Sequence, residues 1–111
     1  MNWLLLFTAL SGAMAVAAGA FGAHGASSPE AKELLRLGGQ YQLIHAVAAL
    51  AALNLGARGP GWLFVAGGAV FAGSLYAIAL GAPRGLGAVT PVGGTAMIVG
   101  WLWLAWVAMR R

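Results

Sequence analysis

The chain has no cysteine and very little charge. Only 7% of its 111 residues are charged, and just two residues are acidic. Without cysteine the chain can form neither disulfides nor thiolate metal sites. A soluble domain carries roughly 25% charged residues, so water is not the main solvent for this surface. We therefore expect a single domain, residues 1–111, that lies in the lipid bilayer.

Positive charge is present but thinly spread. The net charge of +4 comes from six lysines and arginines, which occur singly or in pairs. This distribution argues against a nucleic-acid-binding patch, and we expect no nucleic-acid partner. It is typical of loop charges that orient membrane helices.

Apolar residues dominate, at 61% of the chain with a mean hydropathy of +0.86. Residues 58–61 and 81–85, which combine glycine, proline and arginine, are predicted helix breaks. The first apolar run is long enough as a helix, roughly 31 Å, to cross a bilayer. The sequence predicts an all-α integral membrane protein, a four-helix up-down bundle. Its expected spans cover about residues 3–23, 38–56, 62–80 and 91–109.

The connection between the first two spans contains a strong helix start. Ser27 and Ser28 offer a hydroxyl cap, Pro29 suits a first turn, and Glu30 lies near the positive helix end. In residues 31–36 the apolar side chains fall on one side and the charges on the other. This pattern predicts a short interfacial helix between helices 1 and 2, with a solvated loop as the alternative.

Small residues recur at every fourth position in the first and third spans. Such stripes let helix backbones approach closely, although a chain with 18 glycines also produces them by chance. We expect tight packing of helices 1 and 3 through two stripes, namely Ser11, Ala15, Gly19 and Ala23, and Ala69, Gly73, Ala77 and Gly81.

Lysine and arginine counts do not decide the orientation, because each membrane face carries three. The face of the two termini has Arg58, Arg110 and Arg111, and the other has Lys32, Arg36 and Arg84. Four tryptophans form a plausible interfacial belt at the face of the termini: Trp3, Trp62, Trp103 and Trp106. The two acids partly offset the second set of cations, and we expect both termini in the cytoplasm.

Four motifs occur in order along the chain. They are Gly19-Ala20-Phe21-Gly22-Ala23-His24-Gly25, Tyr41-Gln42 with His45-Ala46, Gly73-Ser74-Leu75-Tyr76 with Ala79-Leu80, and Leu86-Gly87 with Thr90-Pro91 and Gly93-Gly94. In these motifs the chain resembles the domain-of-unknown-function family four-two-three, small bacterial inner-membrane proteins with eukaryotic transmembrane relatives. The resemblance covers nearly the whole chain. It implies a four-helix protein of the inner membrane with no established enzymatic activity, and a basic C-terminal tail typical of members favours cytoplasmic termini. Ala72 departs from the family, in which serine is common at this position.

The motifs place most polar residues in one half of the membrane. In an up-down bundle this half, opposite the termini, holds the end of helices 1 and 3 and the start of helices 2 and 4. A hydrogen-bonded cluster is expected there from His24, Gln40, Tyr41, Gln42, His45, Ser74, Tyr76 and Thr90. Tyr41 and Gln42 can flank His45, because residues three and four apart are neighbours on a helix.

The chemistry of this cluster stays open. In the structural interpretation, His45 donates to a carbonyl or to Thr90 and the network fixes helix register. In the alternative, the protein binds a lipid or a quinone-like amphiphile, or serves as a transporter subunit. Haem or metal ligation by His24 and His45 needs further ligands that the chain barely offers, so no cofactor is expected.

Catalysis is not expected, since Ser74 has no evident base or nucleophile turn. The sequence thus predicts a small structural or accessory inner-membrane protein. A homo-oligomer or a larger membrane complex is compatible with either interpretation.

Overall fold

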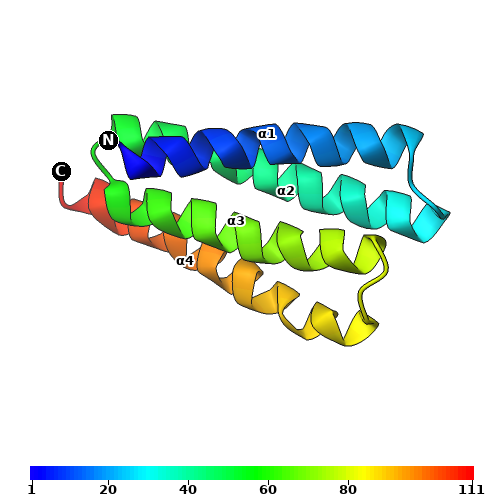
Figure 1. The fold of residues 1–111 in the computed structure, drawn as a ribbon. Helices are drawn as coiled ribbons and strands as arrows, with labels where there is room; N and C mark the ends of the chain where they lie inside the picture. The colour runs from blue at the N-terminus through cyan, green and yellow to red at the C-terminus, as the bar shows by residue number, and fades with distance from the viewer.

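The protein is entirely helical. A computed structural model describes residues 1–111 and contains five helical elements. They are α1 (Trp3–His24), α2 (Pro29–Asn54), α3 (Arg58–Ala79), the short 3-10 helix η1 (Arg84–Ala88) and α4 (Thr90–Met109). Figure 1 shows both termini at one end of an elongated molecule. The turn between α1 and α2 and the η1 segment lie at the opposite end, called the distal end below. The expected all-α class is confirmed.

Three segments are long and apolar enough to cross a membrane. They are Trp3–His24, Arg58–Ala79 and Arg84–Met109. α2 is as long as these but more polar, because its first turns carry two acids and two bases. Its apolar neighbours α1 and α3 both pack against it.

α2 starts at the predicted signal. The Ser28 hydroxyl accepts a hydrogen bond from the Ala31 backbone N–H at 3.0 Å, and Pro29 occupies the first helical position. The same helix then continues without a break to Asn54. The expected separate interfacial helix is therefore wrong, since nothing after Pro29 interrupts the backbone hydrogen bonds. Its residues form the first turns of α2.

The turn between α2 and α3 is shorter than expected. Residues 58–61 were predicted as a break, yet α3 already begins at Arg58. Pro60 is tolerated there because a proline in the first turn gives up an N–H that has no partner within the helix. The reversal is made instead around Gly56, whose φ of +75° suits glycine.

The helices pack in the order of the chain. α1 packs on α2, α2 on α3 and α3 on α4, and α1 makes a smaller contact with α3. The molecule measures about 48 × 26 × 21 Å along its principal axes. α2 and α3 are therefore the inner helices, and α1 and α4 flank them.

The expected packing of helices 1 and 3 through two small-residue stripes is wrong. A Cβ atom added to Gly19 or Gly73 would meet nothing within 4 Å. The buried residues of α1 form a different row, in which successive members are three or four positions apart. This row packs mainly on α2. Of the predicted stripes, only Ser11 and Ala15 are buried; Ala77 is half-buried, and the exposed members are Gly19, Ala23, Ala69, Gly73 and Gly81.

Close backbone approach occurs at other glycines. α3 and α4 meet at Gly67 and Gly93, where a Cβ on Gly93 would lie 2.3 Å from the Phe71 backbone nitrogen. α1 and α2 meet at Gly39, whose added Cβ would lie 3.1 Å from the Ala15 carbonyl oxygen. These glycines let dispersion forces act between backbones, as in other membrane helices.

The C-terminus is tied to the end of α2. The guanidinium of Arg111 donates to the carbonyl of Leu55, the residue that caps α2. Arg110 lies over the Trp106 ring, 4.8 Å from its centroid. A cation at this position also interacts favourably with the negative end of the helix dipole.

We predict that Gly93→Ala destabilises the protein and that Gly94→Ala does not. The added methyl at residue 93 forces α3 and α4 apart, at a cost of about 1–3 kcal/mol. At residue 94 the nearest atom is 3.8 Å away in the Phe71 ring, so the higher helix propensity of alanine should dominate. Unfolding of both variants in mixed micelles measures the difference. Equal stability of the two variants would contradict the close contact.

Candidate functional site

His45 is the centre of the most extensive polar arrangement in the protein. Its side chain projects from α2 and its residue is only 5% exposed. Its Nε2 lies 3.0 Å from the indole Nε1 of Trp101 on α4, and its Nδ1 lies 2.7 Å from the Tyr41 carbonyl oxygen. A single imidazole thus joins α2 to α4.

These two partners fix the tautomer of His45. The indole N–H of Trp101 can only donate, so Nε2 must accept. The proton then resides on Nδ1, which donates to the carbonyl of Tyr41. The ring is therefore neutral, and neither nitrogen retains a free lone pair for a ligand.

Aromatic rings enclose this hydrogen bond. The Phe64 ring of α3 lies beneath it, with its centroid 5.6 Å from that of His45 and 4.6 Å from that of Trp101. The approach of Phe64 requires glycine at residue 100, where a Cβ would lie 2.8 Å from the Phe64 ring. The His45–Trp101 pair thus connects α2 to α4, with Phe64 of α3 packed against it.

A second polar contact joins α2 to α3. The Tyr76 hydroxyl donates to the Gln42 side-chain oxygen at 2.7 Å, and Gln42 is 5% exposed. The Tyr76 ring passes close to Gly38 of α2, where an added Cβ would lie 2.7 Å from it. Glycine at residue 38 is therefore what allows tyrosine to reach Gln42.

A third polar contact joins α3 to the start of α4. The Ser74 hydroxyl donates to the Phe71 carbonyl at 2.8 Å, and its oxygen lies 2.5 Å from the Thr90 hydroxyl oxygen. The only hydroxyl proton of Ser74 is used in the bond to Phe71. The Thr90 hydroxyl must therefore be the donor in its bond with Ser74. Ser74 is 3% exposed, so the pair satisfies a buried hydroxyl.

Six of the eight predicted cluster residues thus form three separate pairs. Gln42 bonds with Tyr76, and Ser74 bonds with Thr90. The contact of His45 with Tyr41 uses the tyrosine carbonyl, while the two rings stack at 6.3 Å. Two members lie outside the pairs: Gln40 accepts from Arg36 on the exposed side of α2, and His24 is exposed with no hydrogen-bond partner.

The depth of His45 also differs from expectation. The motifs predicted both histidines at one face, with His45 near the start of its helix. Because α2 begins at Pro29, His45 lies about 24 Å along the helix axis from that end. His24, by contrast, is the last residue of α1 at the distal end. The two histidines do not share a site.

The motifs did not predict Trp101, which donates to His45 in this site. It was the one tryptophan left out of the predicted interfacial belt, because it falls inside its apolar run. That position is itself a signal: an indole N–H away from the interface needs a partner, and His45 is the acceptor.

The comparisons with known proteins agree with the apolar character of the chain, because the relatives are named membrane proteins. The family described as "Protein of unknown function (DUF423)" matches residues 18–94. The chain belongs to this family. The predicted resemblance is thereby confirmed.

Relatives are similar along nearly their whole length. A UPF0382 membrane protein of Haemophilus influenzae is 41% identical, over 98% of this chain and 95% of the relative. The UPF0382 inner membrane protein YgdD of Escherichia coli is 40% identical, over 98% of this chain and 91% of the relative. The UPF0382 membrane protein SSP2132 of Staphylococcus saprophyticus is 38% identical, over 94% of each chain. No solved structure matches the chain.

We predict energetic coupling between His45 and Trp101. His45→Leu leaves the indole N–H without an acceptor, and Trp101→Phe leaves Nε2 without a donor, each at a cost of about 1–2 kcal/mol. The double variant should lose less than the sum, with a coupling energy of ~0.6 kcal/mol and up to about 1.7 kcal/mol. Free energies of unfolding for the parent and the three variants give this value.

Two further variants control for ring size and hydrogen bonding. Trp103→Phe removes an indole that makes no hydrogen bond and should show no coupling to His45→Leu. His45→Gln retains a donor and an acceptor and should cost less than His45→Leu. A coupling energy of zero would remove His45–Trp101 as a stabilising pair.

Proposed function

We propose that this protein is a four-span inner-membrane protein with a structural or accessory role. In this arrangement α1 to α4 cross the bilayer alternately as an up-down bundle, and α2 is the fourth span. Support comes from the three apolar segments, from the placement of α2 between α1 and α3, and from the termini lying at one end. The inner-membrane name of the Escherichia coli relative favours the same location.

The observation that best supports a structural role is that the paired polar side chains have their hydrogen bonds satisfied within the protein. Each buried polar side chain among Gln42, His45 and Ser74 has a partner on a neighbouring helix. His45 and Ser74 each also donate to a carbonyl of their own helix. Groups satisfied in this way fix helix register and leave little capacity for a substrate. We infer that the pairs hold α2, α3 and α4 together and do not perform catalysis.

The charge distribution supports cytoplasmic termini. The end with the termini carries Arg58, Arg110 and Arg111 together with the α-amino group, and both acids of the chain lie at the distal end. There, Glu33 pairs with Arg36 and Glu30 pairs with Arg84, each at 2.5 Å. The hydrogen bond from Arg36 holds the pKa of the Glu33 carboxyl below its usual value, so this pair stays ionised. Positive charge without an acidic partner therefore concentrates at the terminal end. Because the lysine and arginine counts of the two ends are equal, this asymmetry is the basis on which we expect the termini in the cytoplasm.

Because the chain has no cysteine, its topology can be tested with single cysteines. We expect a membrane-impermeant maleimide to label Ser27→Cys in intact cells and to spare Leu55→Cys and Arg110→Cys. After permeabilisation all three should react, since all three positions are exposed. The opposite pattern reverses the orientation. Different behaviour of residues 55 and 110 would remove the four-span model.

The structural role also predicts that the purified protein carries no haem and no stoichiometric metal. Both nitrogens of His45 are engaged, so no position is left for an axial ligand. An absorbance spectrum and elemental analysis of the parent and of His45→Leu provide the measurement. A chromophore or metal that is present in the parent and absent from His45→Leu would overturn the structural role in favour of ligand binding.

A further inference from the structure

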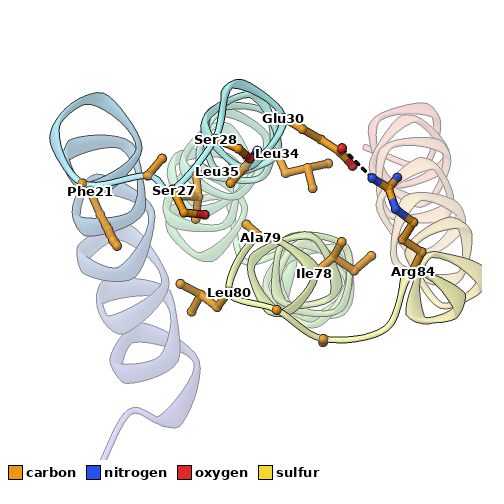
Figure 2. Close-up of a pocket in the computed structure, with 15 residues that line it drawn as sticks. Phe21, Ser27, Ser28, Glu30, Leu34, Leu35, Ile78, Ala79, Leu80 and Arg84 are labelled. Carbon is orange, nitrogen blue, oxygen red and sulfur yellow. Dashed lines mark hydrogen bonds and ion pairs between the residues drawn. The ribbon is translucent and has the colours of Figure 1, made fainter.

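An ion pair bridges the two connections at the distal end. Arg84, at the start of η1, donates to Glu30 in the first turn of α2 at 2.5 Å, as the dashed line in Figure 2 shows. Their side chains are 78% and 51% exposed. The contact uses one guanidinium nitrogen and one carboxylate oxygen, and the remaining donors and the second oxygen have no protein partner. The pair therefore keeps a free cationic side and a free anionic side.

Two hollows meet at this ion pair. One, the distal pocket, has a volume of about 460 Å³ and lies between the α1–α2 turn and the end of α3. The other, the lateral groove, has a volume of about 450 Å³ and is formed by α2, α3, η1 and the start of α4. Both are lined by Glu30, Arg84, Leu34 and Ile78. Each volume lies within the range of about 300–1,000 Å³ that is usual for small-ligand sites.

The polarity of the lining changes from one hollow to the other. The lining of the distal pocket includes the hydroxyl residues Ser27 and Ser28, and Figure 2 shows both on the α1–α2 turn. Away from the ion pair, the lateral groove is lined by Phe71, Leu75 and Pro91. The ion pair thus lies where a hollow with hydroxyl groups in its lining meets a groove with apolar side chains.

We propose that the distal end binds one phospholipid with a phosphoethanolamine headgroup. Its phosphate accepts hydrogen bonds from the free N–H groups of Arg84, and its ammonium donates to the free oxygen of Glu30. One acyl chain lies in the lateral groove. Binding adds to the Glu30–Arg84 pair without breaking it, because each partner has hydrogen-bonding capacity left.

The carboxylate of Glu30 gives this site its selectivity. A phosphoglycerol lipid offers the same phosphate to Arg84 but brings no cation for Glu30, so the carboxylate repels its net negative charge. A phosphocholine lipid has a cation without N–H groups and cannot donate to Glu30. A reversed orientation of the protein would move the site to the other leaflet without changing its lipid preference.

Native mass spectrometry of the full-length protein tests the selectivity. The probes are phosphatidylethanolamine, phosphatidylglycerol and phosphatidylcholine with identical dioleoyl chains, offered in equal amounts in detergent. We expect phosphatidylethanolamine to be retained about two- to fivefold more than either competitor, the ratio typical of an exposed charge pair. Glu30→Gln should abolish this preference, and Glu33→Gln should keep it, because Glu33 pairs with Arg36 and lines neither hollow.

A second pair of variants tests the groove itself. Gly87 lines the lateral groove, and its added Cβ would meet only the Ile78 side chain, at 3.8 Å. Gly87→Leu should therefore fill the groove without disturbing the fold and lower the occupancy of all three lipids. Gly85→Leu, on the same 3-10 helix in open space, should leave occupancy unchanged. Equal retention of the three lipids by the parent, or equal effects of Glu30→Gln and Glu33→Gln, would overturn the headgroup assignment. Equal effects of the two leucine variants would overturn the groove.

Discussion

The most polar helix of the protein is also an inner helix, and the rest of the structure follows from that constraint. α2 carries Gln42 and His45 within a chain whose other helices are strongly apolar. Buried polar groups with no partner are costly, and lipid tails offer none. α2 must therefore be covered by helices that bring their own polar atoms, which Tyr76 and Trp101 supply.

Glycine sets how closely the neighbouring helices can approach α2. Gly38 gives room to the Tyr76 ring, and Gly39 faces the backbone of α1 at Ala15. Adjacent glycines on α2 thus serve two different neighbours. The same residue type admits Phe64 beneath the His45–Trp101 bond, at Gly100. Hydrogen bonding and close packing are therefore linked, because Gly38 lets Tyr76 reach Gln42 and Gly100 admits the ring that packs on the His45–Trp101 pair.

Local signals in the sequence were sufficient for the helices and for some of the pairs. The cap at Ser28 and the apolar runs predicted where most helices lie, and the motif residues Gln42, Tyr76, Ser74 and Thr90 do meet across helices. The helix predictions succeed because capping and hydropathy act over a few residues. The pairs were expected because helices that alternate in direction bring these motifs toward the same end.

Predictions that needed the relative rotation of helices failed. The small-residue stripes through Gly19 and Gly73 point to open space, because alternating steps of three and four residues carry the true contact row away from a strict four-residue stripe. The depth of His45 was misjudged because it depends on where α2 begins. The Glu30–Arg84 pair joins residues 54 positions apart, and no local pattern predicts such a contact.

The order of the helices along the chain has a consequence for biosynthesis. A polypeptide is made from its N-terminus, so α2 emerges before the residues that satisfy it. The hydroxyl of Tyr76 follows Gln42 by 34 positions, and the indole of Trp101 follows His45 by 56. The nascent α2 must keep these side chains hydrated, or shielded by the insertion machinery, until α3 and α4 arrive. The polar contacts of α2 are thus completed only after α3 and α4 have been made.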